Sequence, residues 1–191
     1  LLEDFRWLHK DRLMLLPVLM VLWANSHGGF VVGFLLWGVY AADAAWRLVP
    51  ALVKRYKPHM ILNVSQAASG LKPLKRLIFI GLLLAVGACL TPLGPRLLLY
   101  PFETVGIGAL RAYIQEWQSP DFHNLSVQPF AWLLLLTLGV VGASRRRLAL
   151  SDFLLAAGFA YMGLLAGRNV ALFALAAPLV ITRHAEPVLS Q

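Results

Sequence analysis

A long polar stretch from Pro92 to Pro129 gathers side chains that could do chemistry. It carries three of the nine carboxylates in the chain, together with a histidine. Carboxylates and histidines are common general acids and bases, so we expect a catalytic site, if the chain has one, near this stretch. The catalytic candidates are the carboxylates Glu103, Glu116 and Asp121, with His123 and Trp117 close to them in the sequence.

Asp121 and His123 form a D-x-H pair within a predicted turn. Carboxylate and imidazole groups both bind divalent metal ions. Two ligands do not complete a metal site. A divalent metal ion bound by this pair is therefore a hypothesis, and the sequence predicts no certain cofactor.

Two short polar turns, at residues 25–29 and 167–169, supply candidates for phosphate binding. His27 precedes a predicted helix, whose free N–H groups favour anions, but a capping or packing role fits this position at least as well. Arg168 suits a phosphate partner, while an arginine that reaches for the membrane interface would look the same. Asn169 beside it fits a helix cap.

The composition indicates what must position these residues. Hydrophobic residues make up 59% of the chain, charged residues 14%, and the mean hydropathy is +0.70. A soluble domain averages roughly 45–50% apolar and about 25% charged residues. Continuous apolar runs favour membrane-spanning helices over the alternating strands of a barrel. We therefore expect an all-α, polytopic transmembrane helical bundle.

The apolar runs predict about six spans in a single membrane domain over residues 1–191. A charged amphipathic segment opens the chain, and the first span either starts inside it or crosses only part of the bilayer. The chain starts on charged residues without a signal-peptide pattern, so we expect it to be a piece of a longer polytopic protein. The predicted spans cover residues 13–24, 30–49, 77–90, 130–143, 151–166 and 170–181.

The distribution of basic residues predicts the orientation. With six spans, fourteen of the seventeen Lys and Arg residues fall on one side, which the positive-inside rule places in the cytoplasm. The net charge of +8 is then a property of cytoplasmic loops, and no nucleic-acid partner is expected. The other side, carrying the 92–129 loop, holds only Arg96, Arg111 and Arg168.

Within the outer loop, apolar residues at helical spacing predict a short interfacial helix. Pro101 lies near its start and Glu103 in its first turn, where the helix dipole favours a carboxylate. Trp117 near its end also fits a simple interfacial anchor. The apolar positions are Ile107, Leu110, Ile114 and Trp117. On the opposite side of the membrane, we expect Asp43 and Asp152 to pair with nearby arginines.

Three segments resemble motifs of a family of bacterial multi-pass membrane proteins. The sequence LWANSHGGF at 22–30 resembles its W-x-N-x-H-G-G-F motif, and IQEWQSPDFH at 114–123, with YPFE at 100–103, resembles its outer loop. RNVALFAL at 168–175 resembles its late R-N-x-x-L-F motif. The family is grouped with polyprenol-dependent glycosyltransferases of the GT-C type. Thr91 departs from it, because the family tends to have asparagine there.

The resemblance implies transfer of a sugar from a polyprenyl-phosphate carrier to an acceptor on the outer face. A carboxylate would act as general base on the acceptor hydroxyl, and a cation would stabilise the phosphate leaving group. Arg168, assisted by His27, is the candidate for the phosphate, and Trp117 and Asn169 are candidates for substrate binding. Glu103, Glu116 and Asp121 would contact the acceptor or a metal.

Two further classes remain open. The chain could be a non-catalytic structural or assembly subunit that packs against other membrane subunits, in which case His27 and Arg168 would be packed shut. A transporter would carry charged residues deep within several helices, and the predicted spans have almost none there.

Overall fold

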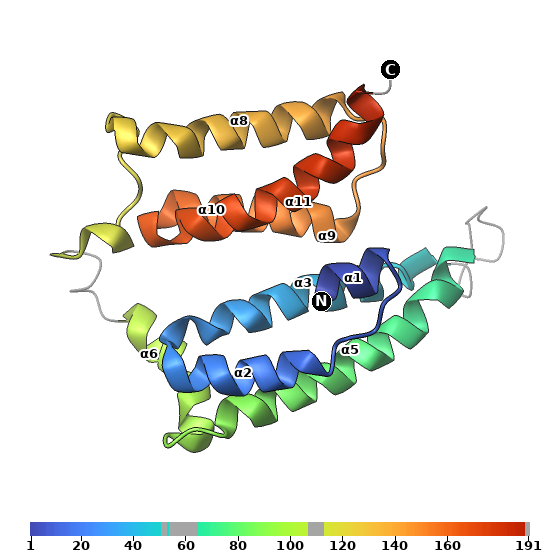
Figure 1. Ribbon diagram of the computed structural model, residues 1–191, viewed down its shortest axis with the longest axis vertical. Helices are drawn as coiled ribbons and strands as arrows, with labels where there is room; N and C mark the ends of the chain where they lie inside the picture. The colour runs from blue at the N-terminus through green and yellow to red at the C-terminus, as the bar shows by residue number, and fades with distance from the viewer. Residues whose placement is uncertain (51–52, 54–64, 107–112, 190–191) are drawn as a thin grey trace. The chain divides into compact units, whose positions relative to one another are not determined.

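The computed structural model describes residues 1–50, 53, 65–106 and 113–189, and within these residues every regular element is helical (Figure 1). The all-α prediction is therefore confirmed. The chain divides into two compact units, Leu1–Gly106 and Ile107–Gln191, and each is described by itself. The single membrane domain expected from the sequence stays a prediction.

Two helices are long and apolar enough to cross a membrane, Gly28–Trp46 and Leu125–Ala143, with 19 residues each. The helix over Leu71–Cys89 and the one over Gly94–Thr104 would make a third span if the pair, bent by 109°, counts as one. Leu15–Ser26 and Leu150–Leu165 are apolar but shorter. These lengths support a helical membrane protein. The count of six spans stays a prediction from the sequence.

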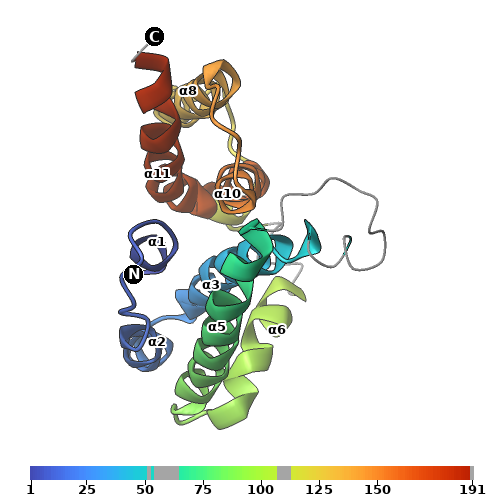
Figure 2. The same cartoon turned by 90° about the vertical axis from the view of Figure 1, so that its right-hand side faces the viewer.

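In the first unit, α2 and α3 both pack against the long helix α5 (Figures 1 and 2). The buried face of α5 repeats at helical spacing through Leu77, Ile80, Leu84 and Ala88. The elements are α1 (Leu2–Trp7), α2 (Leu15–Ser26), η1 (Gly28–Phe30), α3 (Val31–Trp46), α5 (Ser65–Cys89), η2 (Gly94–Leu99) and α6 (Tyr100–Gly106).

A glycine allows α3 and α5 to approach closely. A Cβ on Gly81 of α5 would lie 2.3 Å from the indole of Trp37 on α3. The same indole donates a hydrogen bond from Nε1 to the Leu77 carbonyl, at 2.8 Å. The aromatic ring therefore fills the space over Gly81 and keeps its polar atom satisfied inside an apolar contact.

The first unit corrects two expectations about helix bounds. The opening segment forms a separate helix, because His9 has a φ of 55° and α2 begins only at Leu15. Pro17 consequently lies in the first turn of α2, where its missing N–H costs no helix bond. Helix α5 begins at Ser65, well before the predicted start at residue 77. Glu103 does lie in the first turn of α6, as predicted.

In the second unit, α11 packs against both α8 and α10 (Figure 1). Phe130 of α8 meets Phe173 of α11 edge to face, with ring centroids 5.6 Å apart. Gly163 of α10 admits the Phe130 ring, since a Cβ there would lie 2.8 Å from it. The elements are η3 (Gln115–Trp117), η4 (Leu125–Val127), α8 (Gln128–Ala143), α9 (Leu150–Phe153), the π-helical η5 (Leu154–Gly158), α10 (Phe159–Leu165), η6 (Gly167–Asn169) and α11 (Val170–Leu189).

Two expectations differ in this unit. Helix α11 continues to Leu189, whereas the sequence predicted an end near residue 181. The interfacial helix expected through Trp117 is interrupted, because Ile114 is extended and only the turn η3 follows it. The part of that helix at residues 107–112 lies outside the described residues, as does the basic segment at 54–57.

Candidate functional site

The segment that carries Glu116 and Trp117 lies against the turn that carries Arg168, within the second unit. The Gly167 N–H donates a hydrogen bond to the Gln118 carbonyl, at 3.0 Å. A Cβ on Gly167 would lie 3.8 Å from the Glu116 carbonyl oxygen, so the two backbones pass in close contact. Segments about fifty residues apart in the sequence thus form one surface, which we call the Trp117–Arg168 site.

Arg168 stacks on the indole of Trp117, with its Cζ 3.3 Å from the ring centroid. The guanidinium is partly desolvated there, which lowers the pKa of Arg168, while the nearby Glu116 carboxylate acts to raise it. Arginine stays protonated in proteins. The arrangement therefore holds a permanent cation on an aromatic face, with Arg168 still exposed to solvent.

A pocket of about 490 Å³ opens between the segment at 115–130 and the turn that carries Arg168. Glu116 and Asp121 both line it, and Gly167 and Val170 form the part of the wall next to Arg168. Phe130 contributes an apolar surface. The pocket thus brings together two of the three catalytic candidates, while Trp117 and Arg168 adjoin it through their chain neighbours.

Asp121 and His123 make the local pair that the sequence indicated. The Asp121 Oδ1 accepts a hydrogen bond from the His123 backbone N–H at 3.0 Å and lies 3.0 Å from its Nδ1. These contacts, the backbone one first, lower the pKa of Asp121. In the part of the chain that the structure describes, no group of three or more His, Cys, Asp or Glu could hold a metal ion.

Asn169 has a capping role. Its Nδ2 donates to the Met162 carbonyl at 3.0 Å, so Asn169 caps the carbonyl end of α10, the helix that precedes it. This contact fixes the turn that presents Arg168. Asn169 therefore supports the site by positioning its neighbour.

His27 and Glu103 belong to the first unit, so the Trp117–Arg168 site is described without them. His27 caps η1, because its Nδ1 accepts a hydrogen bond from the Gly29 N–H at 2.8 Å. The capping interpretation is confirmed, and the side chain is still exposed. Glu103 is exposed at the start of α6.

Sequence reasoning missed a tether at this end of the first unit. Asn25 donates from Nδ2 to the Val21 carbonyl at 2.8 Å and to the Leu90 carbonyl at 2.9 Å. It thereby links the end of α2 to the residue that follows α5. Its place in the polar turn at 25–29 was a signal, but the sequence offered no reason to choose Leu90 as its partner.

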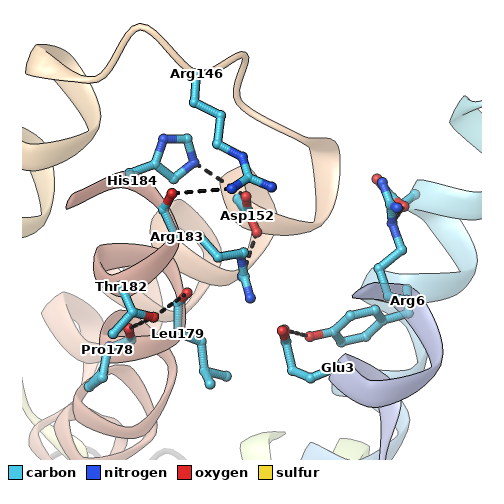
Figure 3. A network of polar contacts seen from close by, with 11 residues as sticks. Glu3, Arg6, Arg146, Asp152, Pro178, Leu179, Thr182, Arg183 and His184 are labelled. Carbon is cyan, nitrogen blue, oxygen red and sulfur yellow. Dashed lines mark hydrogen bonds and ion pairs between the residues drawn. The ribbon is translucent and has the colours of Figure 1, made fainter. Parts of the chain in front are cut away.

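Buried ion pairs lie at the other end of each unit, and Figure 3 shows residues of both clusters. Asp43 meets Arg6 at 2.6 Å and Arg47 at 3.3 Å, and Tyr40 hydrogen-bonds to Glu3. In the second unit, Asp152 meets Arg183 at 2.5 Å and His184 at 3.3 Å. The predicted pairing of both aspartates with arginines is confirmed.

No protein-family model, curated protein or solved structure matches this chain. The resemblance to polyprenol-dependent glycosyltransferases consequently stays an expectation from the motifs. What the structure adds is the geometry around Trp117 and Arg168.

Proposed function

We propose that this chain is part of a membrane transferase that takes a sugar from a polyprenyl-phosphate carrier. One observation carries the proposal: Arg168, a permanent cation, is held on Trp117, and their chain neighbours Glu116 and Gly167 line a pocket together with Asp121. A transfer from a phosphate carrier needs a cation for the leaving group and a carboxylate for the acceptor, and both are present here.

In the proposed reaction, an acceptor hydroxyl attacks the sugar carbon that is bonded to the carrier phosphate. A new C–O bond forms, the bond from the sugar carbon to the phosphate oxygen breaks, and the carrier phosphate leaves with the electron pair. Glu116 takes the proton of the hydroxyl, and Arg168 stabilises the phosphate. The lowered pKa of Asp121 makes it a weaker base, which suits it better to orienting the acceptor or a divalent metal.

The remaining candidates keep supporting roles in this proposal. His27 would assist with the phosphate and Glu103 would contact the acceptor, provided that the first unit brings them to the same substrate. Trp117 holds the Arg168 guanidinium in place, and Asn169 holds the turn. A divalent metal enters only through Asp121 and His123.

We further propose that the chain crosses the cell membrane six times, with its basic connections in the cytoplasm and the 92–129 loop outside. Contacts within each unit support this alternation. In the first unit, Arg6 and Arg47 share one end, while Asn25 meets Leu90 at the opposite end. In the second, Arg146 donates to the Arg183 carbonyl at 3.3 Å, and Arg168 lies at the other end of α11.

The test is binding of a polyprenyl phosphate to the full-length protein in detergent. Arg168→Ala is expected to weaken binding about tenfold or more, which is the usual effect of losing a charged hydrogen-bond partner. Arg168→Lys should restore only part of it, because the flat guanidinium stacks and binds phosphate oxygens in a fixed geometry. Arg96→Ala, which removes an exposed arginine of the 92–129 loop, is the control.

A second candidate function is a non-catalytic subunit of a membrane complex. It is favoured by the contacts of His27 and Asn169, both of which hold local structure. The exposure of His27 and Arg168 counts against the expectation that they are packed shut. Equal carrier binding by wild type and Arg168→Ala, or no binding by folded wild type, would favour this function over the transferase.

A further inference from the structure

A second pocket, almost entirely apolar, runs along the outside of α8. Its volume is about 490 Å³, and it extends from Trp132 through Leu136 and Gly139 to Ala143, with Val188 of α11 at its end. Trp132 is 67% exposed and Leu136 53% exposed, so the second unit itself does not cover these side chains. We call this surface the α8 groove.

Gly139 keeps the α8 groove open. A Cβ added to Gly139 meets no described atom within 4 Å, and the same is true of Gly142 one turn further. Only Gly139 lines the groove. Both glycines thus have open space at Cβ and only one lines the groove, which gives a pair of positions for filling and not filling it.

The length of the groove suits one leaflet of a bilayer. Trp132 and Ala143 are eleven residues apart on one helix, which corresponds to about 16 Å at 1.5 Å per residue. A hydrocarbon core is about 30 Å thick, so the groove covers roughly the depth of one acyl chain. This span, Leu125–Ala143, is itself apolar enough to lie in the membrane.

Exposed positive charge begins where the groove ends. Ser144 terminates α8, and Arg145 and Arg147 follow it, both exposed. Arg146 between them donates to the Arg183 carbonyl, which fixes the loop against α11. Two exposed arginines thus follow the end of α8 at which the groove ends.

We propose that the α8 groove is a binding site for an anionic phospholipid. One acyl chain lies along α8 over Gly139, and the phosphate of the headgroup lies on Arg145 and Arg147. Charge complementarity selects the lipid, because each Arg near a membrane surface favours an anionic headgroup. The site is separate from the Trp117–Arg168 site, which lies at the other end of this unit, and it does not depend on the proposed function.

The experiment uses the full-length protein in neutral detergent micelles, titrated with phospholipids whose acyl chains carry bromine. Bromine quenches the fluorescence of a nearby tryptophan. The difference in quenching between wild type and Trp132→Phe measures lipid bound in the groove. Phosphatidylglycerol is compared with phosphatidylcholine of the same chains. Wild type is expected to bind the anionic lipid at least tenfold more tightly.

Three variants separate the headgroup from the chain. Arg145→Gln with Arg147→Gln should abolish the preference, since each arginine contributes about a fivefold difference. Gly139→Leu should weaken both lipids, and Gly142→Leu should leave both unchanged. Equal binding of the two lipids by wild type, or an unchanged preference in the double variant, overturns the proposal. Self-association that Gly139→Leu abolishes, without a lipid preference, would assign the groove to a second copy of this chain.

Discussion

The two ends of each unit differ in whether their charged side chains are buried or exposed. At the basic end, the aspartates are buried, with Asp43 2% and Asp152 0% exposed. Asp43 is paired with Arg6 and Arg47, and Asp152 is paired with Arg183 and also contacts His184. At the opposite end of the second unit, Glu116, Asp121 and Arg168 are all exposed and line or adjoin a pocket.

This difference separates structural charge from charge that is available to a ligand. Burying a charge lowers the stability of the fold unless a partner of opposite sign compensates it. The carboxylates of Asp43 and Asp152 already have such partners, so their role is structural. The exposed groups have kept most of their solvation and can exchange water for substrate. We therefore place chemistry at the exposed end and stability at the basic end.

The largest expected effect comes from neutralising a buried aspartate. Asp43→Asn should lower the free energy of unfolding by about 3 kcal/mol, because Arg6 and Arg47 would then face each other without this carboxylate. The measurement is titration with a denaturing detergent in mixed micelles, followed by circular dichroism.

The control for this experiment is Asp121→Asn at the exposed end, which should leave the free energy of unfolding almost unchanged. If the two substitutions cost the same, the division between the two ends is wrong.

A smaller effect is expected from the tether at the other end of the first unit. Asn25→Ala removes two hydrogen bonds to backbone carbonyls, one of them to Leu90. Because the site is exposed, water can replace these bonds, and the loss should be about 1 kcal/mol. Ser26→Ala, which removes only a bond to the Trp23 carbonyl within the same helix, is the neighbouring control. An equal loss in both variants would mean that Asn25 does not tether α5.

The stacked pair at the Trp117–Arg168 site should contribute still less to stability. Arg168→Ala is expected to cost about 0.5–1 kcal/mol, the usual range for an exposed cation–π contact. Its effect on carrier binding should be several times larger in free energy. If Arg168→Ala lowered the stability as much as Asp43→Asn does, the role of Arg168 would be structural.

The smallest effect concerns the Asp121–His123 pair. The lowered pKa of Asp121 means that its contribution to stability is present above the ordinary aspartate range and is lost as pH falls through the folded-state pKa. His123→Ala should raise this pKa only part of the way, because the backbone N–H, the larger cause, remains. Carboxyl-carbon NMR across an acid titration measures the shift. A complete return to the ordinary pKa would make the imidazole the main cause.

Composition and the spacing of apolar residues were enough to predict a helical membrane protein. Apolar runs without alternation predicted helices, and α8 and the segment Leu150–Leu165 fall close to their predicted bounds. Helix ends were less predictable. The start of α5 at Ser65 and the end of α11 at Leu189 include polar residues that local hydropathy assigns to loops.

Only the tertiary structure decided which polar groups meet. Arg6 and Asp43 are 37 residues apart, and Gln118 and Gly167 are further apart still, so sequence distance gives no sign of either contact. The types of these residues followed from the sequence, because lipid excludes unpaired charge and each aspartate therefore needed a cation. Their partners did not follow, because the helix packing set by contacts such as Trp37 on Gly81 determines which side chains come within reach of one another.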